Sequence, residues 1–143
     1  MSEQTPDEPG QGIRVRPFEF DFPEQLDTVW VPGNPYRSHF FNGVSLTMPY
    51  LEPYLVKTMR EAMELVDDED LRADMRGFNG QEAQHYRCHR RLNVVLTNSG
   101  QPGFAEVERR IDRAYKRLST RSLRTRMAYS AGFECIPMVL PTG

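Results

Sequence analysis

Apolar residues recur at helical spacing along most of the chain, and the longest such stripe is interrupted by polar side chains. Its members lie three or four residues apart, on one face of a helix expected from about Glu69 to Asn98. The members are Leu71, Met75, Phe78, Glu82, His85, His89, Leu92 and Leu96. We expect this face to be buried, and an unpartnered buried carboxylate is costly. Glu82 therefore needs a neutralising partner, and a metal ion is the leading candidate.

A second long stripe comes earlier and predicts another helix, from near Pro49 to about Val66. Its members are Met48, Glu52, Leu55, Met59, Ala62 and Val66. Residues 36–44 are expected to form only a short helix or turn. Glu52 is thus a second carboxylate in a core stripe, 30 residues before Glu82. An antiparallel helical hairpin with a short turn brings residues at this interval to the same level.

Two shorter stripes predict two further helices. The stripe of the third helix consists of Phe104, Val107, Ile111, Ala114 and Leu118. The stripe of the fourth helix, which begins near Thr120, consists of Leu123, Met127, Ser130, Glu134 and Met138. Glu134 is a third carboxylate expected in the core, and Pro137 is expected to bend or end its helix. The whole pattern predicts an all-α fold, an antiparallel helical bundle.

The amino-terminal region has a different pattern. Residues 1–12 are rich in acidic residues, proline and glycine, and we expect a disordered tail there. From Ile13 to Phe22 apolar and polar residues mostly alternate, but Pro17 and Pro23 argue against a central strand. We expect an extended arm that lies over the helices, within a single helical domain spanning residues 13–143.

Two glycines, Gly77 and Gly80, precede the polar part of the long stripe. Each costs a helix roughly 1 kcal/mol relative to alanine. We expect them at a place where another helix approaches closely.

The pair Glu82-x-x-His85 lets one helix offer a carboxylate oxygen and an imidazole nitrogen to the same ion. Glu52 and Glu134 would add carboxylates from two other helices. Oxygen and imidazole ligands suit iron, manganese or zinc rather than calcium, and we expect a divalent ion, iron first. Such a site supports redox chemistry with dioxygen or activation of a metal-bound water. Hydrogen bonds, or a partner of Glu52 such as Arg60 or Arg76, would explain these residues without a metal.

Further motifs surround these positions: Asp21-Phe-Pro23, Trp30-Val-Pro-Gly-Asn-Pro35, His39-Phe-Phe-Asn42, Ser45, Met59-Arg60 and Gln81-Glu-Ala-Gln-His-Tyr-Arg-Cys-His-Arg-Arg-Leu-Asn93. Together they resemble the predicted metal-dependent hydrolase family, a ferritin-like group, over about residues 14–134. The resemblance implies a ferritin-like helical bundle with a two-metal centre. It matches ligand positions to Glu52, Glu82, His85 and Glu134. It also matches His89 and Asn93 to a His-x-x-x-Asn continuation, as a ligand or as residues that support one.

The family continues beyond the helix of Glu134 to a helix that bears a second Glu-x-x-His, and this chain ends before it. We therefore expect a bundle that is incomplete at its carboxyl end. It would be a fragment, a truncated copy, or a protomer that completes its bundle as a homodimer. Besides His85 and His89, the chain holds only His39, which we expect at the rim of the pocket or in a structural role.

Composition limits the kinds of partner that the protein is expected to bind, but it does not indicate the reaction. The net charge of −2 gives no field that would recruit nucleic acid or an anionic membrane. No apolar run is long enough to span a membrane, and the two cysteines suit reduced thiols in a cytoplasmic protein. We expect a small-molecule substrate of unidentified class and no nucleic-acid partner.

The leading function hypothesis is a metal-dependent hydrolase that activates a metal-bound water. A di-iron oxidase or oxygenase that uses the same residues is the first alternative. The second alternative is a truncated, non-catalytic helical module that pairs its exposed stripe with a partner.

Overall fold

The computed structural model describes residues 12–100 and 102–139 and contains four helices there. They are α1 (Pro35–Met63), α2 (Glu69–Asn98), α3 (Phe104–Leu118) and α4 (Leu123–Val139). No strand occurs within these described ranges, so the all-α prediction is confirmed. The predicted bounds of the second helix are confirmed as well. The tail expected at residues 1–12 lies, except for Gly12, outside the described residues.

α1 begins much earlier than the sequence pattern predicted. Asn34 caps it by accepting a hydrogen bond from a backbone N–H of the first turn at 2.9 Å, and Pro35 occupies that turn. Pro49, which was predicted to start the helix, lies inside it together with Pro53. The prediction was wrong because the first turns of α1 carry no continuous core stripe: Tyr36, for example, is 80% exposed.

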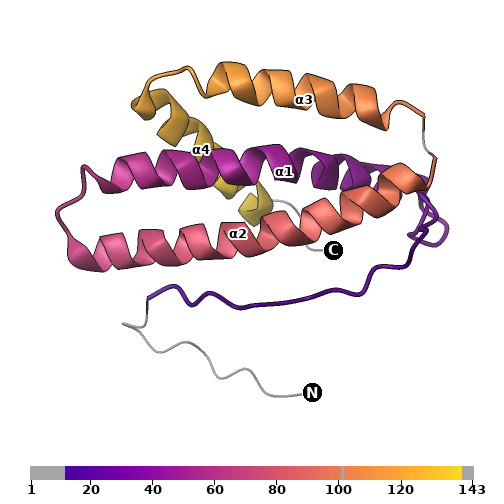
Figure 1. Ribbon diagram of the computed structural model, residues 1–143, viewed down its shortest axis with the longest axis horizontal. Helices are drawn as coiled ribbons and strands as arrows, with labels where there is room; N and C mark the ends of the chain where they lie inside the picture. Colours follow the sequence, from indigo (N-terminus) through magenta and orange to yellow (C-terminus); the bar gives the residue numbers. More distant parts are fainter. Residues whose placement is uncertain (1–11, 101, 140–143) are drawn as a thin grey trace.

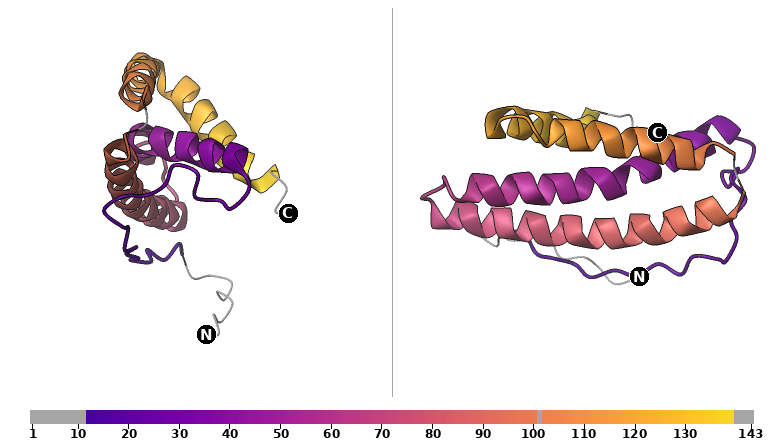
Figure 2. Two further views of the ribbon diagram at one scale, coloured as in Figure 1. Left: turned by 90° about the vertical axis from the view of Figure 1, so that its right-hand side faces the viewer. Right: turned by 45° about the horizontal axis from the view of Figure 1, so that its top comes forward.

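α1 is the central helix, and it forms a long antiparallel hairpin with α2 (Figure 1). α2, α3 and α4 each pack against α1 from a different direction (Figure 2). The core between them is built on Leu51 and Leu55, each 1% exposed, and on aromatic rings. Tyr54 of α1 meets Tyr115 of α3 and Tyr129 of α4 edge to face, at centroid distances of 5.6 and 5.7 Å.

α2 starts at a strong local signal. Asp68 accepts a hydrogen bond from the backbone N–H of Leu71 at 3.0 Å, and two acidic residues lie in the first turn. Leu71 itself is 49% exposed, so its predicted burial was wrong. The buried part of the stripe begins one turn later, at Met75.

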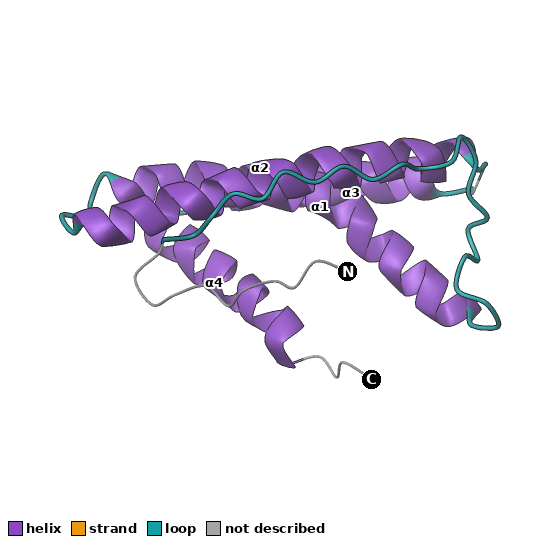
Figure 3. Ribbon diagram, turned by 90° about the horizontal axis from the view of Figure 1, so that it is seen from below, coloured by secondary structure: helices purple, strands orange, loops and turns teal. Residues whose placement is uncertain are grey.

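The amino-terminal arm runs along α2 as an extended loop (Figure 3), in the same direction as the helix (Figure 1). The backbone N–H of Ile13 donates to Asp74, and farther along the hydroxyl of Ser99 donates to the carbonyl of Leu26 at 2.6 Å. An arm that lies over the helices was predicted. Its contacts place it over α2, on the side where the two glycines of that helix lie.

Those glycines make room for the arm rather than for another helix. A Cβ atom on Gly77 would lie 2.3 Å from the carbonyl oxygen of Ile13, and one on Gly80 would lie 2.3 Å from a methyl group of Val15. The expected close approach is therefore real, but the expected partner was wrong. An extended chain has no side-chain periodicity that would reveal this contact from the sequence.

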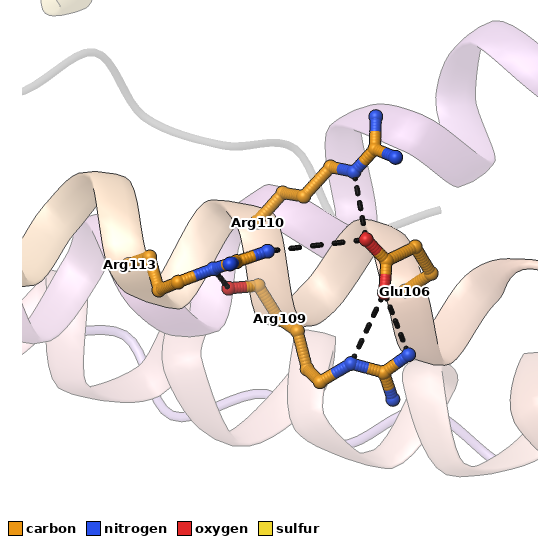
Figure 4. A network of polar contacts seen from close by, with 4 residues as sticks. All are labelled: Glu106, Arg109, Arg110 and Arg113. Atoms are coloured by element: carbon orange, nitrogen blue, oxygen red, sulfur yellow. Dashed lines mark hydrogen bonds and ion pairs between the residues drawn. The ribbon is translucent and has the colours of Figure 1, made fainter.

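The outer face of α3 carries locally paired charges. Glu106 binds Arg109 at 2.6 Å and Arg110 at 2.9 Å, with Arg113 nearby at 3.9 Å (Figure 4). Spacings of three and four residues place these groups on one exposed face. None of the helices in the described part of the chain is long and apolar enough to cross a membrane.

α4 ends at Val139, two residues after Pro137, which was expected to bend or end it. In one respect α4 differs from its prediction. Glu134, expected in the core, is exposed. Ser130, one turn earlier on the same face of α4, is buried, so the burial of this face ends before Glu134.

Candidate metal centre

The middle of the α1–α2 hairpin brings three potential metal ligands together. Glu52 comes from α1, and Glu82 and His85 come from α2. One donor atom of each residue lies within 4.8 Å of the donor atoms of the other two. The 30-residue interval in an antiparallel hairpin is what places the two glutamates at the same level.

Glu52 is a buried carboxyl group without a balancing charge. It is 2% exposed, and its Oε2 atom has no hydrogen-bond partner in the described part of the chain. Burial and then the negative charge of Glu82 raise the pKa of Glu52 to about 8. No arginine of the described residues forms an ion pair with it, so Arg60 and Arg76 do not play the role considered for them. A divalent cation would satisfy both the orphaned oxygen and the missing charge.

Glu82 and His85 form a close pair one helical turn apart. Nδ1 of His85 lies 3.4 Å from Oε1 of Glu82. Hydrogen bonding to Glu82 raises the pKa of His85, against the opposing effect of burial. Two donors of one tetrahedral zinc ion lie about 3.3–3.6 Å apart, because each ligand bond is about 2.0–2.2 Å long. The pair therefore fits a shared ion.

The cluster is buried at its two carboxylates and partly exposed at His85. The His85 side chain is 46% exposed, whereas the carboxylates are buried, so the expected burial of His85 was wrong. The ring of Phe18, from the arm, lies beside His85 at a centroid distance of 5.8 Å. The arm thus contacts the cluster at His85.

His89 lies one turn after His85, on the other side of Glu52. Its Nε2 atom is 3.9 Å from Oε1 of Glu52, too far for a hydrogen bond and a few tenths of an ångström beyond the donor spacing of a tetrahedral zinc ion. Its Nδ1 atom is 3.0 Å from the hydroxyl of Ser45. Burial and then the positive charge of His85 lower the pKa of His89, which favours the neutral imidazole that metals bind.

The remaining sequence candidates lie outside the three-residue cluster. Glu134 of α4 is exposed, yet its pKa is raised by partial burial and by the charge of Glu82, so it lies near the cluster. Its role as a ligand stays a prediction. His39, expected at the rim of the pocket or in a structural role, is exposed on α1 and lies outside the cluster.

Sequence reasoning assigned no role to two neighbours of the site. Phe18 is one, since an extended arm has no register that predicts its contacts. Ser45 is the other, and the sequence contains a feature from which its role could have been predicted. Pro49 follows four residues later and cannot donate a helical hydrogen bond to the Ser45 carbonyl, so that oxygen needs another partner.

Comparison with known proteins identifies one family. A family model described as "Predicted metal-dependent hydrolase" matches residues 14–140. No curated protein and no solved structure matches the chain. The match spans nearly the whole chain and includes Glu52, Glu82 and His85, the residues that the fold gathers at one point. This chain therefore belongs to the predicted metal-dependent hydrolase family.

Proposed function

We propose that this protein binds a divalent metal ion between α1 and α2 and uses it to hydrolyse a small-molecule substrate. The observation that carries the proposal is the buried Glu52, which has an orphaned oxygen and a strongly raised pKa beside a second buried carboxylate. Folded proteins seldom bury such a group unless something compensates its charge. The family description supports hydrolysis as the reaction.

Each residue of the cluster has a distinct role in this proposal. Glu52 and Glu82 would hold the ion with carboxylate oxygens, and His85 with an imidazole nitrogen. His89 and Glu134 are proposed as further donors. When bound, the ion supplies Lewis acidity, which makes water a nucleophile near neutral pH. The exposed part of His85 offers the route by which a substrate would reach the site.

The first experiment measures metal binding itself. Purified protein stripped with a chelator is incubated with Zn²⁺, Mn²⁺ or anaerobic Fe²⁺, and bound metal is counted by mass spectrometry after desalting. We expect about one ion per chain or more, because the donors are pre-assembled. Glu82→Gln and His85→Ala should each weaken binding at least about 100-fold, since each removes a ligand.

Matched controls keep this experiment specific. His39→Ala and Glu64→Gln remove the same kinds of group from exposed positions on and next to α1, away from the cluster. Both should bind metal as the wild type does. If the wild type retains no more of any of the three metals than the Glu82→Gln variant, the proposal is wrong.

The reaction is tested on the metal-loaded protein. Zinc- or manganese-loaded protein should hydrolyse activated aryl esters or phosphate esters faster than the His85→Ala variant under the same conditions. Dioxygen uptake by the iron-loaded protein, with no hydrolysis by any metal form, would replace the hydrolase with the oxidase or oxygenase alternative. A metal-free, well-folded wild type would favour the non-catalytic helical module.

A further inference from the structure

Two buried polar residues lie behind His89, on the side away from Glu52. Ser45 comes from α1 and Asn93 comes from α2, and they are 2% and 3% exposed. The hydroxyl of Ser45 and the side-chain amide of Asn93 share one hydrogen bond, and the amide forms a second with the backbone carbonyl of Ser45. The serine hydroxyl is also 3.0 Å from Nδ1 of His89. Buried polar groups with few possible partners can form their mutual hydrogen bonds in only one arrangement.

Pro49 fixes the orientation of the Asn93 amide. In a regular helix the carbonyl of Ser45 would accept a hydrogen bond from the N–H of residue 49, and proline has none. The Asn93 side chain replaces it, with Nδ2 donating to the Ser45 carbonyl at 3.0 Å. A carbonyl oxygen can only accept, so the amide nitrogen must face it. The amide oxygen therefore faces the hydroxyl of Ser45.

This orientation determines where the Ser45 proton lies. The hydroxyl donates its one hydrogen to Oδ1 of Asn93 at 2.8 Å. Towards Nδ1 of His89 it can then only accept, which requires the histidine proton to be on Nδ1. The other ring nitrogen, Nε2, is left with its lone pair. Nε2 is the atom that lies 3.9 Å from Oε1 of Glu52.

We infer that Ser45 and Asn93 are positioning residues that hold His89 in the Nδ1–H tautomer and so make its Nε2 atom a fourth donor to the metal site. The inference rests on the proposed function for the ion itself. A metal-binding histidine commonly donates its other ring N–H to a neighbour, which orients the ring and strengthens it as a ligand. Here that neighbour is the hydroxyl of Ser45. Because this hydroxyl donates its own hydrogen to Asn93, it can only accept the hydrogen bond from Nδ1 of His89.

The same contacts exclude a nucleophilic role for Ser45. A serine nucleophile donates its proton to a histidine base and must reach the substrate. Ser45 donates to Asn93 instead, and it is buried between α1 and α2. Ser45 therefore acts through His89.

The tautomer can be read without any metal. Protein labelled with ¹⁵N in its histidines gives three sets of ring signals, and His89→Gln identifies the set of His89. Long-range proton–nitrogen correlation spectra are recorded on metal-free protein about two pH units above the ordinary histidine pKa, where the ring is neutral. We expect a protonated-type signal for Nδ1 of His89 and an unprotonated-type signal for Nε2.

Two variants test the roles of the neighbours. Asn93→Ala frees the hydroxyl hydrogen of Ser45 to donate towards Nδ1, so the proton of His89 should move to Nε2. Ser45→Ala removes the acceptor, so both tautomers should be populated, and Ser45→Thr should restore the wild-type pattern. Ser38→Ala is the matched control, since it removes another buried hydroxyl from α1, one that contacts Val31 and Asn34 instead of a histidine.

Zinc affinity, measured by competition with a chromophoric chelator, connects the tautomer to the site. Asn93→Ala and Ser45→Ala should weaken Zn²⁺ binding about 10- to 100-fold, whereas Ser38→Ala and Ser45→Thr should not. An Nε2–H signal in the wild type would overturn the inference. So would wild-type zinc affinity in an Asn93→Ala protein whose tautomer has switched. A wild type with the Nδ1–H tautomer but no zinc binding would instead refute the proposed function, and with it the ligand role of His89.

Discussion

At the scale of single residues, Glu52 is held in surroundings that disfavour its charge. Its pKa is raised to about 8 by burial and by Glu82, while the same group in an unfolded chain titrates near 4.3. Between these values the metal-free folded protein keeps a proton that the unfolded chain has released. The free energy of unfolding must therefore fall as the pH rises through this window. The raised pKa of His85 acts in the same direction.

Glu52→Gln should remove most of this pH dependence. In urea unfolding of chelator-treated protein, we expect the wild type to lose up to about 4 kcal/mol between about pH 5 and about pH 9, and the variant to lose much less. At the upper end of this range the variant should be the more stable protein, although it cannot bind the ion normally. If the free energy of unfolding changes equally with pH in the two proteins, Glu52 titrates normally and needs no cation to balance its charge.

The residues of this cluster could be identified from sequence because their relation is local. Glu82 and His85 share a face by helical spacing alone, and a short hairpin turn fixes the level of Glu52 relative to both. Exposure was harder to predict. The exposure of His85 and Glu134 depends on which neighbouring elements cover them, and periodicity within one helix contains no such information.

At the scale of elements, the arm and α2 are fitted to each other. Gly77→Ala would add a methyl group 2.3 Å from the backbone oxygen of Ile13, which cannot move as a side chain can. α2 gains helix propensity from alanine, roughly 1 kcal/mol, so the helix should persist and the arm should shift. We expect trypsin to cleave after Arg14 faster in this variant than in the wild type, with unchanged circular dichroism.

Gly43→Ala provides the control for that prediction. Gly43 lies in α1 with nothing within 4 Å of its added Cβ atom. The substitution should stabilise the protein by up to about 1 kcal/mol and leave cleavage after Arg14 unchanged. Equal cleavage of the Gly77→Ala and wild-type proteins would mean that the arm does not rest on α2 in solution.

Element boundaries were predictable where a cap carried the signal and failed where prolines did. α2 begins at its predicted position, where Asp68 caps it. α1 was shortened because Pro49 resembled a helix start, whereas the actual start is the Asn34-Pro35 pair. An internal proline is tolerated there because Asn93, on another helix, supplies a hydrogen bond to the freed carbonyl. Only the tertiary structure contains that compensation.

At the scale of the whole molecule, the proposed ligands differ in how firmly the fold holds them. Glu52, Glu82 and His85 belong to the α1–α2 hairpin, which is the most extensive helix contact of the protein. Glu134 belongs to α4, which has a smaller contact with α1 and exposes the carboxylate. An ion that takes Glu134 as a ligand would therefore link α4 to the hairpin and stabilise α4. An ion bound only by the hairpin would not change the stability of α4.

Hydrogen exchange of backbone amides distinguishes these two cases, because a bound ion makes local unfolding of the segments that it joins less frequent. On adding Zn²⁺ to metal-free protein, we expect slower exchange in α1 and α2 around Glu52 and Glu82. We also expect exchange to slow about tenfold in α4 around Glu134. Glu134→Gln should abolish the effect in α4 and keep it in the hairpin. Unchanged α4 exchange in the wild type would remove Glu134 from the ligand set and confine the site to α1 and α2.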